Sequence, residues 1–480
     1  MGIKSMFFYL SKNKLQFYLF AFLVGITIHS LFPLKQISML VWSCLLLVMV
    51  AVYSINKRSK ILFFALLSLC LGLLRFDLSI ASGEFTANNR HQALIASLRP
   101  GKYGPQAIAK IEGRPTWHPP QKIRLNLKDP IPIGSKIEFD CMIKTIQKQE
   151  DQSKYDFYRL HYYGAYSCNP QNINILAQPN PLDFRYDFYN WRASLTGRIQ
   201  SEIPGDDGIL IAGVLYGERG MSAQNEELFR RAGLTHIIAV SGSNMTLIVS
   251  IVFAVFLGLG LWRRQAFQIT CVSIIAFTFF VGLSASVLRA AIMGILVLTA
   301  RHLGRITKPG HLLMAAATIL CIYNPWMFVY DAGFALSFLA SIGLIYGSSV
   351  LIEKLSYIPE FFGLREAAAT TLAASIMTIP YIALVFERLS LAGLFTNLAA
   401  VPLVPWLMLL GAASALTSGT LIAPLFALPA AGVSKIIFSV SGLVNIFPWL
   451  DIHINGMNLV FCLGTYAFII IFWYRLRQKN

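Results

Sequence analysis

Long apolar segments constrain the fold of this chain more than any other feature of its sequence. Three stand at the start, at residues 15–32, 37–55 and 61–80, and each approaches the roughly 20 apolar residues that a helix needs to cross a bilayer. Only 13% of the 480 residues are charged, whereas soluble domains carry about a quarter. The segments predict a polytopic α-helical membrane protein. Residues 15–32 are not expected to be a cleavable signal peptide, because two further spans follow directly.

A second block of apolar segments fills the C-terminal half. Residues 207–217 are apolar but too short to span. Ser222, a typical N-cap residue, and Gly233, a typical helix end, then bracket a predicted short helix. Long apolar runs follow at residues 234–261, 266–283, 284–300, 311–328, 332–352, 367–386, 391–417, 419–447 and 455–474. We therefore assign residues 1–80 to three N-terminal spans and residues 205–480 to a second transmembrane domain.

Basic residues predict the orientation, because cytoplasmic loops are enriched in Lys and Arg. The first span is preceded by Lys4, Lys12 and Lys14, and the second is followed by a basic stretch at residues 56–60. The third span would then deliver residue 81 and its successors to the outside. Arg475, Arg477 and Lys479 follow the last span, so both termini are expected in the cytoplasm of a bacterial inner-membrane protein if the number of crossings is even.

Residues 81–180 form a polar island with short alternating segments at 107–117, 122–128, 136–147, 162–168 and 173–177. Five short β-strands separated by turn residues indicate a small barrel. The OB-fold is the five-stranded barrel that often binds single-stranded nucleic acid. The fold class is thus a helical membrane protein with an extracytoplasmic all-β OB-like domain. Candidate DNA-binding residues there are Lys110, Arg114, Trp117, Lys122 and Arg124. A solvated face on a sheet with aromatic core residues explains the same composition equally well.

The polar island also holds two of the seven cysteines, Cys141 and Cys168. Neither has a CxxC spacing or a nearby His, so a zinc site is not expected. If the island faces an oxidising compartment, a disulfide between them is the natural interpretation.

A basic helical pattern at residues 181–204 connects the two regions, with Arg185, Arg192 and Arg198 among aromatic and aliphatic residues. Such a helix is typical of the membrane surface, and a contact to DNA phosphates is secondary. The chain as a whole carries a net charge of +17. Topology explains half or more of this excess, and the remainder suits a polyanionic substrate.

Three arginines stand against the usual charge bias. If residues 207–217 re-enter the membrane without crossing it, Arg219, Arg230 and Arg231 lie on the outer side. An incoming polyanion would be a reason for positive charge there.

Polar residues interrupt several apolar runs. His236, Ser241 and Asn244 stand in one run, Arg289 in another, and Asp331 begins a third. Asn397 precedes two prolines, Pro402 and Pro405, which predict a broken helix. Ionisable groups inside a membrane are costly and indicate function.

These segments, in this order, resemble the competence domain of the ComEC family, the inner-membrane DNA channel of natural transformation. The similarity rests on Gly217-Glu218-Arg219, on the run from Ala232 to Gly242, on Ser286 to Ala290, on Gly333 to Phe338 and on Asn397 to Pro405. It implies an N-terminal part with an OB-like domain that can carry an internal disulfide. It also implies uptake of single-stranded DNA, with membrane lipid, a DNA receptor, a cytoplasmic ATPase and single-strand-binding proteins as partners. The candidates for the DNA path are then Arg219, Arg230, Arg231, His236, Ser241, Asn244, Arg289, Asp331 and Asn397.

Two departures from the family pattern stand out. Family members often have a second His where this chain has Asn244, and many carry a C-terminal metallo-β-lactamase-like domain. This chain contains no His-x-His-x-Asp-His run, so a nuclease would be a separate protein. It also contains no GxxxxGK[ST] motif, so the driving force would come from a partner ATPase, the proton gradient or binding of the strand inside. No cofactor and no metal are expected.

Other interpretations remain open at this point. Ser241 and His236 could form an activated nucleophile, but no orienting third group is evident, so no catalytic residue is assigned. Packing of small polar residues between helices explains this run as well as a DNA path does. For Arg289 and Asp331, a buried structural ion pair competes with a phosphate contact. The alternative function is a transporter that handles lipid or polysaccharide.

Overall fold

The structure is a computed structural model. It describes residues 14–31, 60–79, 90–101, 104–111, 122–129, 131–132, 134–141, 144–145, 166–168, 170–178, 184–238, 240, 242–282, 284–305, 308–360, 364–454 and 458–478. The chain divides into two compact units, one with residues 1–187 and 311–331 and the other with residues 188–310 and 332–480.

In the first unit, two apolar helices cross at glycines. α2 (Lys14–Leu31) and α4 (Lys60–Asp77) correspond to the first and third predicted spans, and the second, 37–55, lies outside the described residues. A Cβ at Gly25 would lie 2.2 Å from the Leu69 carbonyl oxygen, and one at Gly72 would lie 2.1 Å from that of Phe22. The two backbones therefore touch where no side chain intervenes, as small residues permit between membrane helices.

The same unit contains a helical segment from much later in the chain. The predicted run 311–328 is two helices, α13 (Pro309–Tyr323) and α14 (Trp326–Tyr330), because Asn324-Pro325 interrupts it. Arg75 of α4 donates to the carbonyl oxygens of Ile322 and Tyr323 at 2.8 and 3.0 Å. A cation at the C-terminal end of α13 satisfies carbonyls that the helix leaves unpaired.

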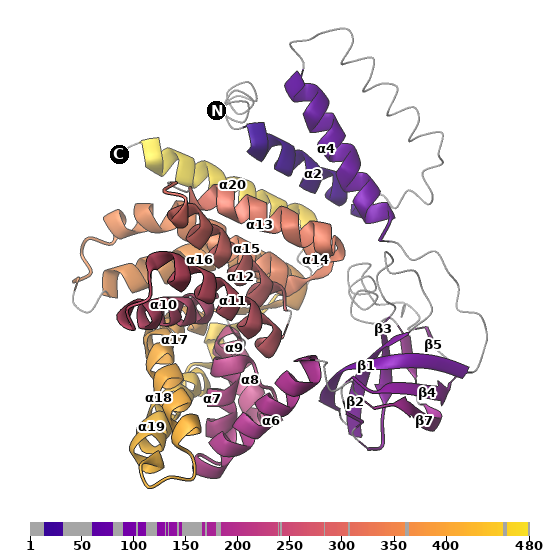
Figure 1. The fold of residues 1–480 in the computed structure, drawn as a ribbon. Helices are drawn as coiled ribbons and strands as arrows, with labels where there is room; N and C mark the ends of the chain where they lie inside the picture. Colours follow the sequence, from indigo (N-terminus) through magenta and orange to yellow (C-terminus); the bar gives the residue numbers. More distant parts are fainter. Residues whose placement is uncertain are drawn as a thin grey trace. The chain divides into compact units, whose positions relative to one another are not determined.

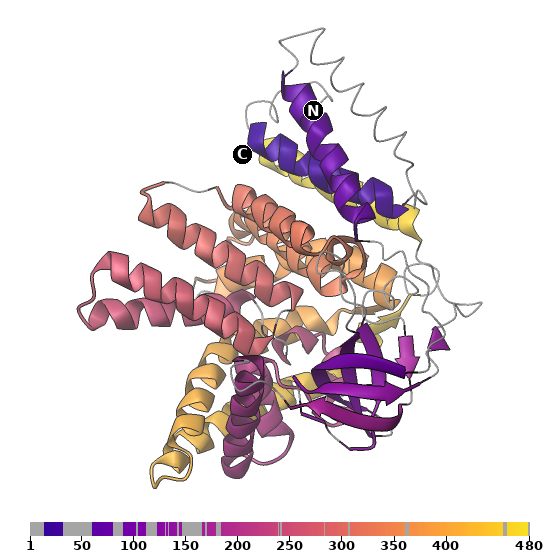
Figure 2. The same ribbon diagram turned by 45° about the vertical axis from the view of Figure 1, so that its right-hand side comes forward.

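An open half-barrel sheet completes the first unit (Figures 1 and 2). Its strands follow the order β5-β6-β3-β2-β1-β4-β7. Their bounds are β1 Arg90–Gly101, β2 Gly104–Ile111, β3 Lys122–Asn126, β4 Lys136–Asp140, β5 Lys144–Thr145, β6 Tyr166–Cys168 and β7 Gln171–Ala177. The prediction of five strands was wrong in number. β1 was missed, and the predicted strand 136–147 contains both β4 and β5.

Alternation along these strands explains the core of the sheet. Ala107 and Ala109 of β2, Ile123 and Leu125 of β3 and Phe139 of β4 are fully buried on one face. β1 pairs antiparallel with β2 and with β4, whereas β3 pairs parallel with β6. The register of β2 and β3 opposes Lys110 to Lys122, so the positions of these two basic residues share the face that points away from the core.

The second unit is helical. Its helices are α6 Phe184–Glu202, α7 Asp206–Tyr216, α8 Ala223–Arg231, α9 Thr235–Ile238, α10 Gly242–Gly258, α11 Arg263–Val281, α12 Ala285–His302, α15 Ala332–Lys354, α16 Leu364–Phe386, α17 Ala392–Ala400, α18 Val404–Thr417, α19 Ala423–Gly442 and α20 Leu459–Gln478. Among the described residues, six helical segments are long and apolar enough to cross a membrane: Arg263–Val281, Ala285–His302, Ala332–Lys354, Arg365–Phe386, Ala392–Thr417 and Ala423–Asn445. The chain is therefore a multi-pass membrane protein.

Several local predictions for this unit are confirmed. Ser222 caps α8 by accepting from the Asn225 amide, and Gly233 adopts φ +69° just after the helix ends. η3 (Val401–Leu403), a 3₁₀ turn, separates α17 from α18 where Pro402 and Pro405 predicted a break. One run was predicted wrongly, because residues 234–261 contain two helices, α9 and α10.

Candidate functional site

Arg289 brings together three of the polar segments that interrupt apolar runs. It lies in the second turn of α12, half-buried, and its guanidinium points to α15. Nε donates to the Ser337 hydroxyl, and Nη1 donates to the Ser341 hydroxyl at 2.7 Å. The Phe338 ring centroid lies 5.9 Å from the guanidinium carbon. Hydroxyls and a ring thus hold a cation inside a span.

The third segment at Arg289 is the start of α10. A Cβ on Gly242, the first residue of α10, would lie 2.9 Å from Nη2 of Arg289. The guanidinium therefore lies beside a helix N-terminus, where the helix dipole adds partial positive charge. Within the described part of the chain, no carboxylate oxygen lies within 4 Å of this guanidinium. For Arg289, the described residues therefore do not support the alternative of a structural ion pair.

A second group of charges, which we call the ionic cluster, joins α8 to the two-stranded sheet of β8 (Arg388–Ser390) and β9 (Asp451–His453). It consists of Glu227, Arg230, Arg231, Arg388 and Asp451. Arg388 donates from Nε to Asp451 at 2.6 Å and from Nη1 to Glu227 at 3.0 Å. Nε of Arg230 donates to Glu227 at 2.7 Å, and Nε of Arg231 lies 3.5 Å from Asp451. Arg230 and Arg231, predicted as DNA contacts, are thus ion-paired here.

The two carboxylates of the ionic cluster differ in exposure. The Asp451 side chain is 6% exposed, whereas that of Glu227 is 41% exposed and that of Arg230 is 57% exposed. An exposed ion pair contributes about 0–1 kcal/mol, but removing one partner of a buried pair costs about 3–5 kcal/mol. Breaking the ion pair between Arg388 and Asp451 therefore costs more free energy than breaking the exposed ion pair between Arg230 and Glu227.

The pKa directions agree with this picture. The strongest influence on Arg388 is its hydrogen bond with Asp451, which raises the guanidinium pKa. Partial desolvation acts to raise the pKa of Glu227, but hydrogen bonds from Arg230 and Arg388 outweigh it and bring the pKa below its ordinary value. Glu227 therefore stays ionised at neutral pH.

Backbone caps fix the end of α8 next to the ionic cluster. Ser390 donates to the Arg231 carbonyl at 2.6 Å, and Thr396 donates to the Ala232 carbonyl at 2.7 Å. A Cβ on Gly233 would lie 2.9 Å from the Cα of Gly393, so α8 and α17 meet backbone to backbone. The position of Arg231 is thus set by its own helix end.

His236 and Asn244 line a small cavity of about 110 Å³ with residues of α18, including Pro405 and Met408. Asn244 is buried and donates to the Val214 carbonyl at 3.0 Å, so it ties α10 to α7. Ser241 lies outside the described residues. The buried Oδ1 of Asn397 has no hydrogen-bond partner in the described part of the chain.

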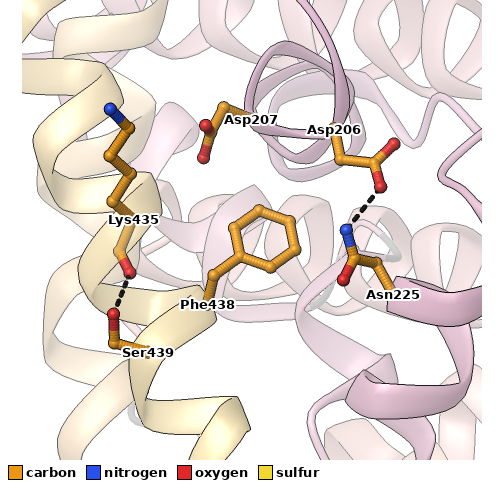
Figure 3. A pocket seen from close by; sticks show the side chains of 6 residues that line it. All are labelled: Asp206, Asp207, Asn225, Lys435, Phe438 and Ser439. Carbon is orange, nitrogen blue, oxygen red and sulfur yellow. Dashed lines mark hydrogen bonds between the residues drawn. The ribbon is translucent and has the colours of Figure 1, made fainter.

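Another cavity, of about 440 Å³, lies where α7, α8 and α19 meet (Figure 3). Asp206 accepts from Asn225 at 2.6 Å, and Asp207 accepts from Ser434 at 2.6 Å. Partial desolvation acts to raise the pKa of Asp206, but hydrogen bonds from Ser222 and Asn225 lower it overall. Two carboxylates and the Lys435 ammonium give the lining a net charge of −1. This lining disfavours a polyanion, so its bonds serve to join the helices.

The remaining predicted residues are dispersed. Arg219 is exposed in the segment between α7 and α8, and Asp331 is buried at the end of α14 in the first unit. Arg114 and Trp117 lie outside the described residues, as do the side chains of Lys122 and Arg124. Cys141 is disulfide-bonded, and its pairing with Cys168 stays a prediction.

Helix α6, predicted to lie on the membrane surface, packs within the second unit. Ile199 is fully buried, and Arg192 forms an ion pair with Glu218 at 3.1 Å. Trp191 is 56% exposed beside it. The surface role of this helix remains a prediction.

Comparison with known proteins shows the family of the chain. A family model described as "Competence protein" matches residues 214–479, which is more than half of the chain. The chain belongs to the competence protein family. The match contains Arg289 and the whole ionic cluster. ComE operon protein 3 of Bacillus subtilis (strain 168) is 24% identical over 316 residues, which cover 65% of this chain and 37% of that protein. The chain thus matches well under half of this relative's length. No solved structure matches the chain.

Proposed function

We propose that this competence-family protein forms an inner-membrane path by which single-stranded DNA crosses during natural transformation. The observation that carries the proposal is Arg289, a membrane cation held by hydroxyls beside the start of α10, without a carboxylate within 4 Å in the described part of the chain. A phosphodiester is the anion that would complete such a site, because guanidinium donors match phosphate geometry. The interaction between Arg289 and a phosphate would offset the hydration free energy that a charged phosphate loses when it enters the hydrocarbon core.

The sheet of the first unit would collect the strand outside the membrane. Its pairings support an OB-like barrel: β1 with β2 and β4, β2 with β3, and β3 parallel to β6. β4 pairs with β1 and β5 pairs with β6, so these two strands lie on opposite sides of the stretch formed by β1, β2, β3 and β6. Lys110, Lys122 and Arg124 would line the outer face of this sheet and neutralise phosphates.

The orientation and partners complete the proposal. Both termini would lie in the cytoplasm and the sheet outside. A DNA receptor would deliver the strand, and a cytoplasmic ATPase and single-strand-binding proteins would draw it in. The proposal assigns no catalytic step to the chain.

The test is uptake of labelled duplex DNA by a transformable host in which this gene is deleted and then restored. We expect the deletion to abolish DNase-protected cytoplasmic label while surface binding stays intact, and restoration to recover it. Unchanged protected label would overturn the proposal and favour a transporter of lipid or polysaccharide.

A further inference from the structure

The ionic cluster contains more arginines than carboxylates. Arg230, Arg231 and Arg388 contribute three positive charges, and Glu227 and Asp451 contribute two negative ones, so the cluster has a net charge of +1. A cluster with unbalanced guanidinium groups attracts anions. Its segments lie between apolar spans, since β8 follows the span that ends at Phe386 and β9 precedes α20.

The two carboxylates do different work in this cluster. Asp451 is buried, and two nitrogens of Arg388 bond to it. Glu227 is half-exposed on the surface of α8, and it accepts from Arg230 through one oxygen and from Arg388 through the other. A carboxylate that spans two guanidinium groups in this way occupies the position that a bridging phosphate would take, because both anions accept bidentate bonds from arginine.

We propose that Glu227 is a built-in competitor for phosphate, which occupies the guanidinium groups of Arg230 and Arg388 until a phosphodiester of the incoming strand displaces it. The identification of that strand as single-stranded DNA rests on the function proposed above. The exchange breaks an exposed bond from Arg230 and a partly buried bond from Arg388, and it releases Arg230 and Nη1 of Arg388 to the phosphate.

The rest of the cluster holds its geometry during this exchange. Nε and Nη2 of Arg388 remain on Asp451, so this arginine stays anchored while one nitrogen changes partner. Arg231 remains on Asp451 and on Asn445, to which Nη1 donates at 3.0 Å. The Ser390 hydroxyl keeps the carbonyl of Arg231 capped. The phosphate would therefore bind to a preformed site.

The exchange gives the site selectivity for polyanions. A small anion has to displace Glu227 without help from any tethered group. Each phosphate of a nucleic-acid strand, by contrast, is held at high effective concentration by the binding of its neighbours. Glu227 thus keeps the arginines from binding stray anions without closing them to nucleic acid.

The experiment compares binding of oligo-dT and of inorganic polyphosphate to the full-length protein in nanodiscs. The variant is Glu227→Gln. The matched control is Glu226→Gln, because Glu226 is the neighbouring residue, carries the same charge and is exposed. We expect Glu227→Gln to bind both probes roughly threefold to tenfold more tightly than Glu226→Gln. Its dependence of log affinity on log salt should steepen by about 0.7, the value for one more phosphate contact on a single strand.

A second variant keeps the test sharp. Adding Arg230→Gln to Glu227→Gln should remove the gain, because the released guanidinium is then absent. Equal or weaker binding by Glu227→Gln than by Glu226→Gln, in protein that keeps its thermal midpoint, overturns the inference. A third outcome is tighter binding of polyphosphate by Glu227→Gln with no binding of oligo-dT by any variant. It would support the competition between Glu227 and phosphate and would overturn the proposed DNA function.

Discussion

Replacing Arg289 by Met separates a role in phosphate binding from a role in folding. The substitution removes the charge and both hydrogen bonds to α15 but leaves an unbranched apolar side chain between the helices. Ser341 keeps the hydrogen bond that it donates to the Ser337 carbonyl at 2.8 Å. No carboxylate within 4 Å among the described residues loses its partner, so the replacement leaves no uncompensated buried charge. We expect the protein to fold and insert at wild-type level.

The cost to uptake follows from the lost interaction. A hydrogen bond to a charged group contributes about 1.5–3 kcal/mol. A loss of about 2–3 kcal/mol at the point where a phosphate passes corresponds to a roughly 30- to 140-fold decrease in uptake rate, since each 1.4 kcal/mol is a factor of ten. Arg289→Lys keeps the charge but loses the planar fork, and we expect it to fall between Met and wild type.

The assay is DNase-protected label per molecule of protein in the membrane, with a thermal midpoint measured in detergent. Uptake by Arg289→Met within twofold of wild type would refute the phosphate contact. A fall in membrane protein that matches the fall in uptake would show that Arg289 acts through folding instead.

Three further predictions follow from other residues. Gly242→Ala places a Cβ 2.9 Å from Nη2 of Arg289, so we expect uptake to fall about tenfold at unchanged protein level; an unchanged uptake rate would show that the guanidinium moves aside freely. Ser241→Ala should leave uptake at wild-type level, because no catalytic step is assigned to it, and abolished uptake would revive a hydrolase. Burial lowers the pKa of His91 in β1, partly offset by a hydrogen bond with the Cys141 backbone. Its neutral form therefore stabilises the sheet above the ordinary His pKa of about 6.5, and this stability is lost as pH falls through the lowered value. The protection factors of β1 and β4 amides in the full chain, which compare exchange with the intrinsic rate at each pH, should fall below about pH 6.5 in wild type and fall less in His91→Phe; an equal fall in both would exclude His91 as the cause.

The sequence predicted those parts of the fold that depend on local pattern. Alternation identified β2, β3 and β4, because buried and exposed residues alternate along them, as at Ala107 and Ala109. Buried and exposed residues also alternate at Ala93 and Ile95 of β1. This strand was not predicted, because Arg, Gln and Pro residues on either side make the pattern weak in the sequence. Helix ends such as Ser222 and Gly233 were found because their signals are local.

The site was harder to predict, because its contacts join distant segments. Arg289 could be found, since a charge inside an apolar run has few explanations. Its partners could not, since Ser337 and Ser341 are 48 and 52 residues away. The sequence analysis did not single out Arg388 and Asp451. They lie 63 residues apart in stretches between spans, and only their ion pair in the structure indicates a role for them.

The hydroxyl partners of Arg289 also constrain how the protein is made. Membrane helices leave the ribosome in sequence, so α12 is complete before α15, which supplies Ser337 and Ser341, has been synthesised. An arginine at the centre of an isolated span costs about 2.5–3.5 kcal/mol on insertion scales, which is an upper bound for Arg289 in the second turn. The nascent α12 therefore gains its hydroxyl partners only when α15 follows, and we expect the segment from α10 to α15 to integrate as a group. A chain that ends between α12 and α15 would then be recognised as unfinished by the proteases that survey the membrane.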